Sequence, residues 1–411
     1  MTTRTSQTQH PGEDPARIRQ VRVPDTAGLR GRSTRDGERE LENTPAPGDL
    51  LLDLTYANTK RWKAPDWALD AFEKGMRRGE SYTPYRGDPG VREDVSASLT
   101  EFIGVDVDPE RNLILTPGTQ GALFAAVAAI VEPGDRVVLF DPEYLATERL
   151  LMYHGAEVRR VPIRWPEGGA PTPDFDRLEA ELATGPRLVV FSHPNNPTGA
   201  VYTPEVVACI AQMISATGTL VILDGLYSRL VYDDYPYQHL AAVDGMAERT
   251  ISLTGPSKTE SLSGFRIGTA TGPAQIIDAM EDVQSVCALR APAYAQHLLS
   301  RWIADDSEYV KQRVADYQEL RDWTIDQLHG SGLFDLRVPM GSAYIYPRPL
   351  VDVSEQEVAV ALKRDAGLVI NPGYQFGTAW PGHMRICFAQ EENEWEAALE
   401  RMFVTIRKLR T

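Results

Sequence analysis

Five short, uninterrupted apolar runs recur between about residues 110 and 272 of the chain. Runs of this kind, unlike alternating ones, are typical of strands that are buried on both faces of a sheet. Helical patterns lie between them, which predicts a mostly parallel sheet with right-handed crossovers. The runs cover residues 113–115, 137–140, 188–191, 220–223 and 250–253.

The pattern changes after about residue 275, where long helical periodicities take over. Two later apolar runs predict strands of a smaller α+β unit. Residues 1–45 are polar and lack the periodicity of a strand or a helix, so we expect a flexible extension there. The predicted helices cover residues 274–290, 293–304, 307–329 and 391–409, and the two predicted strands cover residues 343–346 and 384–388.

These patterns predict two domains after the extension. Residues 81–295 would form the large domain around the parallel sheet. Residues 46–80 would act as an N-terminal arm and join residues 296–411 in the small domain. A chain of 411 residues is long enough for two such cores.

Composition and charge exclude several classes of protein. The net charge of −16 argues against general binding to nucleic acid or to an anionic membrane. No stretch is apolar over the ~20 residues that a membrane span needs, and no apolar signal core begins the chain, so we expect a cytoplasmic protein. The 3 cysteines lack metal-ligand spacing, so we expect neither a metal site nor a disulfide framework.

Polar residues follow the apolar runs, at the strand ends where open α/β sheets bind their ligands. Lys258 follows the last run, 250–253, after the turn residues 254–257. A lysine that forms a Schiff base must be partly desolvated and close to other cations, and a solvated surface lysine is the alternative. Arg266 follows eight residues later, between Gly264 and Gly268, and its planar fork suits a phosphate dianion.

Two further strand ends carry side chains suited to a pyridine ring. Asp224 could provide the counter-charge to a protonated ring nitrogen, or it could cap a turn. Tyr227 could place its hydroxyl on the ring's 3′ oxygen. Asn196 lies in an Asn-Pro turn, where its amide could donate to the same oxygen or simply belong to the turn.

The remaining candidates would hold the phosphate, the ring face and the substrate. Gly118, Thr119 and Gln120 open a helix whose free N–H groups could cradle a phosphate, although many such turns bind nothing. Tyr144 could stack on a flat ring or be an ordinary half-buried aromatic residue. Arg385, inside an apolar run, predicts either a bound substrate carboxylate or an internal ion pair.

Taken together, these residues resemble the class I/II aminotransferases, which are aspartate aminotransferase-like enzymes of PLP fold type I. The resemblance covers roughly residues 50–410. It implies a mostly parallel seven-stranded sheet between helices, plus a smaller α+β domain. The motif residues, in order, are Tyr82, Gly118-Thr119-Gln120, Tyr144, Asn196-Pro197-Thr198-Gly199, Asp224, Tyr227, Ser257-Lys258, Arg266 and Arg385.

The resemblance assigns a role to each of these positions. It implies pyridoxal 5′-phosphate (PLP) as the cofactor, with Lys258 as its Schiff-base lysine and proton shuttle. Asp224 would pair with the ring nitrogen, Asn196 and Tyr227 would hold the 3′ oxygen, and Tyr144 would stack on the ring. The phosphate ligands would be Gly118, Thr119, Gln120, Ser257 and Arg266, with Tyr82 reaching in from the neighbouring subunit of a homodimer that shares its active sites, and the substrate carboxylate would bind Arg385 and Asn196.

The implied reaction moves an amino group from an L-amino acid to a 2-oxo acid through a quinonoid intermediate. The same cofactor could instead support elimination or replacement at Cβ or Cγ, as in a 1-aminocyclopropane-1-carboxylate synthase, a C–S lyase or a natural-product enzyme. A non-catalytic ligand sensor of the same fold is a third alternative.

The sequence departs from the family pattern at Gly225, where the family usually has an acidic residue, at Gly255, and in residues 53–63, where many relatives have a Gly and a Pro. The last departure leaves the substrate open. Gly255 stands where the family often has a serine, so Ser257 or Thr254 would supply the phosphate hydroxyl. Lys60, Arg61 and Lys63 could line the pocket mouth and favour an acidic or phosphorylated substrate, or they could form a solvated basic loop. Arg290 is a further candidate for binding a distal carboxylate.

Overall fold

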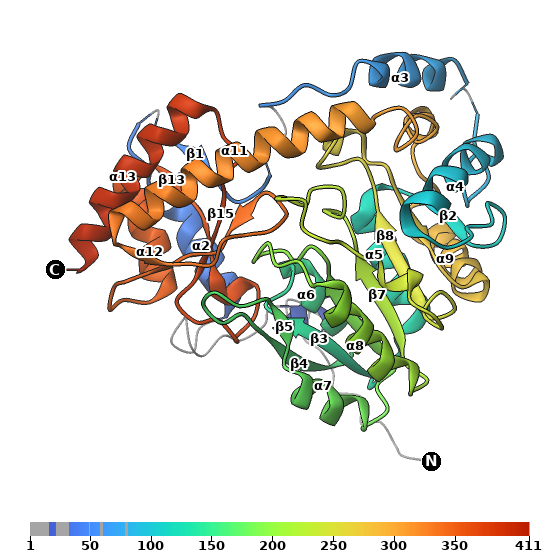
Figure 1. The fold of residues 1–411 in the computed structure, drawn as a ribbon, viewed down its shortest axis with the longest axis horizontal. Coiled ribbons are helices and arrows are strands. Elements are labelled where there is room, and N and C mark those ends of the chain that lie inside the picture. The colour runs from blue at the N-terminus through green and yellow to red at the C-terminus, as the bar shows by residue number, and fades with distance from the viewer. Residues whose placement is uncertain (1–15, 22–32, 49, 58–60, 79–80, 411) are drawn as a thin grey trace, which may run out of the picture.

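The computed structural model describes residues 16–21, 33–48, 50–57, 61–78 and 81–410. Its central feature is an eight-stranded sheet with the order β2-β9-β8-β7-β6-β3-β4-β5 (Figure 1). The strands are β2 (Leu113–Thr116), β3 (Arg136–Asp141), β4 (Glu157–Arg164), β5 (Thr172–Pro173), β6 (Leu188–Ser192), β7 (Leu220–Asp224), β8 (Thr250–Thr254) and β9 (Gly268–Thr271).

The five predicted runs are β2, β3, β6, β7 and β8. Strands β4, β3, β6, β7 and β8 are parallel neighbours, which confirms a mostly parallel sheet. Strand β9 pairs antiparallel with both β2 and β8. The expected number of seven strands is wrong for the described residues, because the two-residue strand β5 adds antiparallel to the edge of β4.

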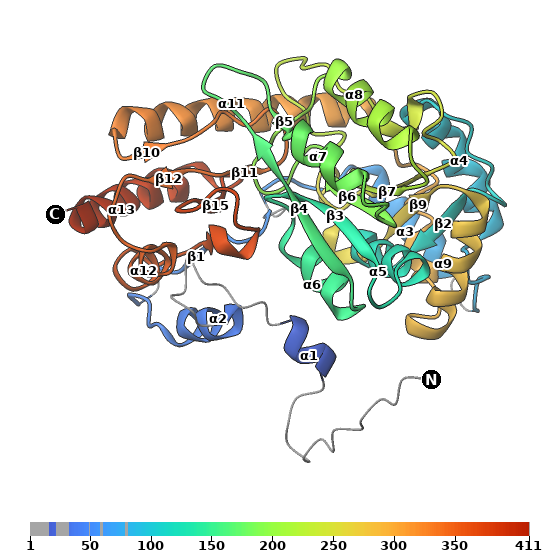
Figure 2. The ribbon, with the colours of Figure 1, turned by 90° about the horizontal axis from the view of Figure 1, so that it is seen from below.

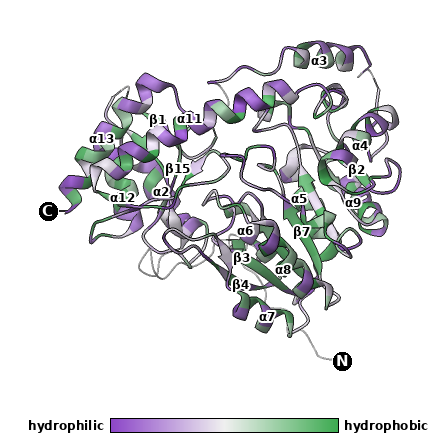
Figure 3. Ribbon diagram, in the orientation of Figure 1, coloured by the Kyte–Doolittle hydropathy of each residue, from purple (hydrophilic) through white to green (hydrophobic). Residues whose placement is uncertain are grey.

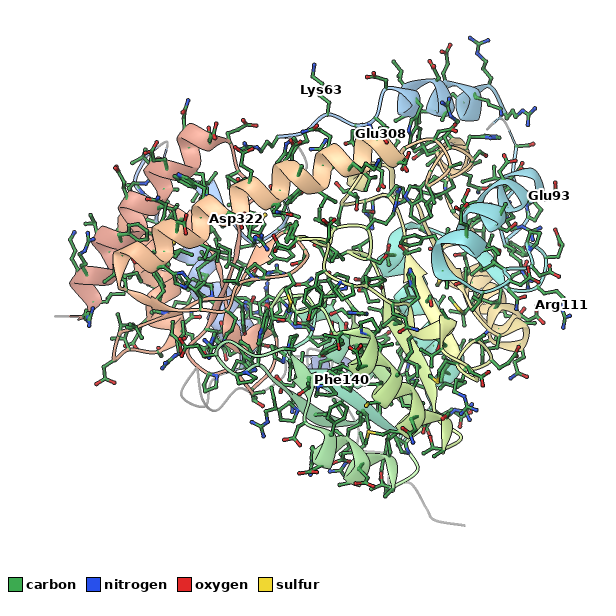
Figure 4. All side chains as sticks on the ribbon, viewed as in Figure 1. Lys63, Glu93, Arg111, Phe140, Glu308 and Asp322 are labelled. Carbon is green, nitrogen blue, oxygen red and sulfur yellow. The ribbon has the colours of Figure 1, made fainter. Side chains whose placement is uncertain are left out.

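Both faces of the sheet are buried, as uninterrupted apolar runs predict. Val137 and Leu139 belong to a core cluster with α5 (Gly118–Ile130) and α9 (Ala274–Cys287). Val138 and Phe140, which alternate with them along β3, belong to the cluster on the other face, with α7 (Phe175–Leu182) and α8 (Pro204–Ser215). Figure 3 shows hydrophobic residues concentrated in this region, and Figure 4 shows Phe140 among the strands.

A smaller unit packs beside the sheet around α11 (Ser307–Ser331), α12 (Glu355–Ala361) and α13 (Glu392–Arg410). A three-stranded antiparallel sheet lies against these helices and carries the substrate-side residues described below. Two pairs of two-residue strands complete the unit. The strands are β11 (Tyr344–Ile345), β15 (Met384–Cys387) and β14 (Asn371–Pro372) in the sheet, and β1 (Leu52–Asp53) with β13 (Leu368–Val369) and β10 (Phe334–Asp335) with β12 (Arg348–Pro349) in the pairs.

Packing around α3 (Trp67–Arg78) differs from the predicted domain division. Trp67 and Ala71 share a core with α4 (Pro89–Ile103) and with β2, so α3 packs with the large sheet rather than with the smaller unit expected for residues 46–80. The predicted helix over 293–304 is also wrong beyond α10 (Ala293–Gln296). Residues 297–304 form turns, because tertiary packing that buries Leu298, Leu299 and Trp302 overrides the helical pattern.

The expected flexible extension contains helices. Helix α2 (Thr34–Asn43) begins with a capping box between Ser33 and Asp36, and it lies beside α12 (Figure 2). The Gln356 Nε2 donates to Gly37 O at 3.0 Å and to the Glu40 carboxylate at 3.0 Å. The prediction of flexibility is therefore wrong for residues 34–43. Helix α1 (Ala16–Val21) lies beside α6 (Leu145–Tyr153), and residues 1–15 and 22–32 fall outside the described residues.

A buried carboxylate joins the large sheet to the smaller unit. Asp141, at the end of β3, accepts hydrogen bonds from Thr378 N at 3.0 Å and from Ala379 N at 3.2 Å. Gly377 has φ of +139°, and a Cβ at this position would collide with the Asp141 carboxylate, so only glycine permits the approach. We call Asp141 with residues 377–379 the Asp141 clasp.

No helix within the described part of the chain is both long and apolar enough to cross a lipid bilayer.

Candidate active site

A cavity of about 340 Å³ lies at the carboxyl ends of β6, β7 and β8 and extends to the smaller unit. Among the predicted site residues, only Gly118 and Tyr82 do not line it. The predicted residues that line the cavity are Thr119, Gln120, Tyr144, Asn196, Asp224, Tyr227, Ser257, Lys258, Arg266 and Arg385. The structure therefore brings together side chains that are up to 266 positions apart in sequence, from Thr119 to Arg385.

Asp224 and Lys258 are the two charged groups at the strand ends. Asp224 ends β7 and is half-buried, and its Oδ1 accepts a hydrogen bond from Leu226 N at 3.1 Å. Burial raises the pKa of Asp224 to about 6, against the lowering effects of the Leu226 N–H and of the Lys258 charge. In the described chain no cation forms an ion pair with Asp224, so its carboxylate remains available to a cationic ligand atom facing the cavity.

The opening of α5 forms a cradle at one end of the cavity. Pro117 precedes the helix and no side chain caps its first N–H groups. The Thr119 hydroxyl is buried without a hydrogen-bond partner. Arg266 is exposed, and its backbone adopts the left-handed conformation. Its guanidinium lies so close to Gly118 that a Cβ at that glycine would be 2.5 Å from Arg266 Nη2. Free N–H groups, an unpaired hydroxyl and a guanidinium fit a phosphate dianion.

Of the two hydroxyls considered as replacements for a serine at Gly255, only that of Ser257 belongs to a residue lining the cavity. The Ser257 side chain is buried and lines the cavity. The Thr254 hydroxyl instead donates to Gly225 O at 3.4 Å and does not line it.

Three neutral polar side chains surround the middle of the cavity. Asn196 and Tyr227 are buried, and Tyr144 is half-buried just before α6. Burial raises the pKa of both tyrosines above the usual 10, so both keep a hydroxyl proton that can be donated. A flat ring with an oxygen substituent fits between such groups.

Arg385 is braced but has no anionic partner. Its Nη1 donates to Asn196 Oδ1 at 2.8 Å, and its Nη2 donates to Asn371 Oδ1 at 2.8 Å and to Thr55 O. The Tyr344 ring centroid lies 4.1 Å from its guanidinium carbon. None of the described carboxylates pairs with it, so the internal ion pair considered above is not present there. A buried guanidinium held by neutral oxygens fits a ligand carboxylate.

Sequence reasoning missed several residues that line the cavity. Asn371 and Tyr344 lie on two-residue strands, and Thr55 lies in a loop after β1. No local signal marks them, since only the pairing of β14 and β11 with β15 brings them to Arg385. Ser192 directly follows the predicted run 188–191 and is the last residue of β6. Its position at a strand end was the available signal.

Of the basic residues near position 60, the two that the structure describes, Arg61 and Lys63, do not line the cavity. Arg61 donates to Gln390 O, and its guanidinium lies 5.1 Å from the Trp62 ring centroid. Lys63 projects outward from the molecule (Figure 4), and Lys60 lies outside the described residues. The described members therefore give no support to an acidic or phosphorylated substrate.

Tyr82 and Arg290 also lie away from the cavity. Tyr82 is 80% exposed, and the Arg290 guanidinium stacks 4.2 Å from its ring centroid and 4.9 Å from that of Tyr85. Neither residue contributes to the site of its own chain. Nor does any group of three or more His, Cys, Asp or Glu side chains among the described residues form a potential metal site.

The sequence matches a protein-family model described as aminotransferase class I and II over residues 53–402. It is 30% identical over 360 residues to a probable aspartate/prephenate aminotransferase of Thermus aquaticus, covering 85% of this chain and 90% of that one. An aromatic-amino-acid aminotransferase of Thermococcus litoralis is 28% identical over 340 residues, covering 82% and 86% of the two chains.

Solved structures agree with the sequence comparison. A crystal structure of an aspartate aminotransferase from Rhodobacter sphaeroides superposes with a TM-score of 0.87 at 34% identity, covering 96% of this chain and 99% of that one. N-succinyldiaminopimelate aminotransferase from Mycobacterium tuberculosis gives a TM-score of 0.84 at 26% identity, covering 96% and 100%. These proteins share the PLP fold type I architecture.

Proposed function

The chain belongs to the class I and II aminotransferase family, and on that premise we propose which of its residues carry out the reaction. It is a PLP-dependent enzyme that moves an amino group from an L-amino acid to a 2-oxo acid. The relatives are named for transfer rather than for elimination, so elimination or replacement at Cβ or Cγ is not favoured.

Lys258 is the residue proposed to hold PLP covalently. When bound, PLP supplies an electron-poor ring that accepts electrons from the substrate Cα. Once the substrate amine has displaced it from the cofactor aldehyde carbon, the Lys258 amine would take the proton from the substrate Cα and carry it to that same cofactor carbon, C4′. Asp224 would keep a proton on the ring nitrogen, because none of the described cations forms an ion pair with its carboxylate.

The other cavity residues orient the reactants. Thr119, Gln120, Ser257 and Arg266 would bind the phosphate together with the N–H groups that begin at Gly118. Tyr144 would lie on the ring face, and Asn196 and Tyr227 would donate to the ring oxygen. Arg385 would hold the substrate carboxylate, since its Nη atoms are fixed by neutral oxygens and its charge is not cancelled.

The functional enzyme is proposed to be a homodimer that shares its active sites. Tyr82 is exposed and does not line the cavity of its own chain, which supports a role in that of the second subunit. Tyr85 is also exposed, and one guanidinium, that of Arg290, stacks on both rings. Exposed aromatic side chains of this kind are common at interaction surfaces.

The observation that carries the proposal is that Lys258 and Asp224 face one cavity that ends in the α5 cradle. Borohydride treatment of the holoenzyme, followed by peptide mass mapping, should find the pyridoxyl label on Lys258. A holoenzyme labelled on another residue would contradict the assignment. An absorbance screen of amino donors against the same holoenzyme should identify the substrate, because a donor converts the cofactor to its amino form.

A further inference from the structure

Glu143 is a buried carboxylate that contacts two residues lining the cavity, and it has no role in the proposed reaction. It precedes Tyr144 and is only 2% exposed. Its Oε1 accepts a hydrogen bond from Tyr144 N at 2.7 Å. Its Oε2 accepts from Ser192 N at 2.7 Å and faces the Ser192 hydroxyl at 2.9 Å. One side chain thus contacts both the residue proposed to stack on the ring and the end of β6.

The hydroxyl of Ser192 extends this contact to the Asn196 turn. Its Oγ receives Asn196 N at 3.0 Å and Asn195 Nδ2 at 3.2 Å. A serine hydroxyl has one proton and two lone pairs, so two incoming donors leave its proton for Glu143. Both Glu143 oxygens therefore act as acceptors. The chain of contacts continues from Asn196 Oδ1 to Arg385 Nη1.

We propose that Glu143 is a positioning residue that fixes Tyr144, Asn196 and, through Asn196, Arg385 in one mutual arrangement. The inference rests on the roles proposed above for Tyr144 and Asn196. A buried polar network in which every member is satisfied specifies a single geometry, and loss of one member disturbs the others. Glu143 joins the turn after β3 to the end of β6 through three hydrogen bonds, and Asn195 Nδ2 adds one more to Pro142 O at 3.1 Å.

Hydrogen-bond donors surround the Glu143 carboxylate. Burial raises the pKa of this carboxyl to about 8, and the charge of Asp224 adds to that rise. The N–H groups of Tyr144 and Ser192 and the Ser192 hydroxyl oppose it by stabilising the charged form. Because the groups that contact the two oxygens are all donors, the hydrogen-bond geometry favours the charged carboxylate even though burial raises its pKa.

Glu143→Gln tests the proposal with little change in size. Whichever way the amide is turned, its NH₂ group faces the backbone N–H of either Tyr144 or Ser192, and that donor loses its partner. We expect PLP affinity, measured by equilibrium dialysis, to weaken about tenfold. The absorbance maximum of the remaining holoenzyme should shift, because both the ring face and the ring oxygen lose their alignment.

Glu355→Gln is the matched control. Glu355 is also buried, and its two oxygens also accept one backbone N–H each, from Tyr374 and Gly382. It does not line the cavity. Glu355→Gln and Glu143→Gln should lower the unfolding temperature by similar amounts, because each leaves one backbone N–H without its acceptor. Only Glu143→Gln should change the PLP affinity and the cofactor absorbance. Equal PLP affinity and absorbance in wild type, Glu143→Gln and Glu355→Gln would overturn the proposal.

Two further variants separate this inference from the proposed function. Asn196→Ala and Tyr144→Ala act on the cofactor directly, so if both leave PLP affinity intact, the assigned roles are wrong. If they weaken it and Glu143→Gln does not, only the positioning role is wrong. Should Glu143→Gln fail to fold, Ser192→Ala keeps the carboxylate and both backbone donors, and an unshifted cofactor spectrum in that variant would reject the network.

Discussion

The cavity has two halves that hold their charges in different ways. The half proposed to bind the cofactor, here called the cofactor half, comprises Thr119, Asp224, Lys258 and Arg266 at strand ends of the large sheet and at the opening of α5. The half proposed to bind the substrate, here called the substrate half, comprises Thr55, Tyr344, Asn371 and Arg385 on short strands and a loop of the smaller unit. In the first half, Asp224 is held by a single backbone N–H. In the second, Arg385 is held by three neutral oxygens and an aromatic face.

This difference follows from what each half has to do. Groups that exchange protons with a ligand need charges that the protein has not already neutralised. A group that only holds a carboxylate needs a fixed direction and a full charge, which amide and carbonyl oxygens provide without cancelling it. Reactive and positioning functions can therefore be separated by experiment.

Lys258→Ala should produce the largest effect. Loss of the amine removes both the covalent attachment and the group that moves the proton, so turnover should fall by a factor on the order of a thousand or more. Steady-state assays with the best amino donor would measure it. Turnover within tenfold of wild type would remove the distinction between a reactive half and a holding half.

Asp224→Asn should change the pH dependence of stability in the cofactor-free protein. The folded pKa of Asp224, about 6, is raised above the ordinary 3.8, so the folded state binds this proton more tightly than the unfolded state. The contribution of Asp224 to the unfolding free energy is therefore fully present below about pH 4 and is lost as the pH rises through 6. The asparagine variant should lack this loss, which is on the order of 3 kcal/mol in unfolding free energy.

Urea titrations at pH 4 and pH 7 would test that prediction. Asp174→Asn is the control, because hydrogen bonds from Arg177 N and then from Arg164 lower the pKa of Asp174. Its stabilisation is present above the ordinary Asp pKa of 3.8 and is lost only below it. Asp174→Asn should therefore leave the difference in unfolding free energy between pH 4 and pH 7 almost unchanged. If the unfolding free energy changes equally with pH in wild type and in Asp224→Asn, then the cofactor half carries no unneutralised charge at Asp224.

Arg385→Ala should raise the KM for every amino-acid substrate by about 30-fold or more, equivalent to about 2 kcal/mol of lost charged hydrogen bonding. Arg385→Lys should recover only part of this, because an ammonium group cannot make the planar two-point contact. Both variants should keep PLP bound, and the cofactor absorbance should shift in the alanine variant because Asn196 loses its Arg385 donor. If the KM rises for one substrate alone, Arg385 contacts a substrate side chain instead.

Tyr82→Phe should have the smallest effect, a few-fold weakening of PLP binding through one lost hydrogen bond. Because Tyr82 lies outside its own cavity, the loss should appear in the partner's site. Mixing this variant with Lys258→Ala should therefore give a hybrid dimer in which the only intact lysine faces a normal Tyr82. A hybrid with the weakened affinity of Tyr82→Phe would show that the tyrosine serves its own chain.

The two halves also differ in how well the sequence predicts them. Asp224 and Lys258 follow apolar runs, and parallel strands bring such ends to one edge, so their proximity could be anticipated. Asn371 and Tyr344 reach Arg385 only through pairing of two-residue strands, which leaves no periodic signal. Glu143 was visible as a carboxylate beside Tyr144, but its acceptor role depends on Ser192, about 50 residues away, meeting it across neighbouring strands.

The Asp141 clasp restricts how the two halves of the cavity can move relative to each other. Its hydrogen bonds join the end of β3 to the segment after Phe376, and Glu143 N adds another to Phe376 O at 2.8 Å. Together with the hydrogen bond between Arg385 and Asn196, this joint ties the smaller unit to the large sheet on two sides of the cavity. The separation between Tyr144 and Arg385 is therefore set before a substrate enters.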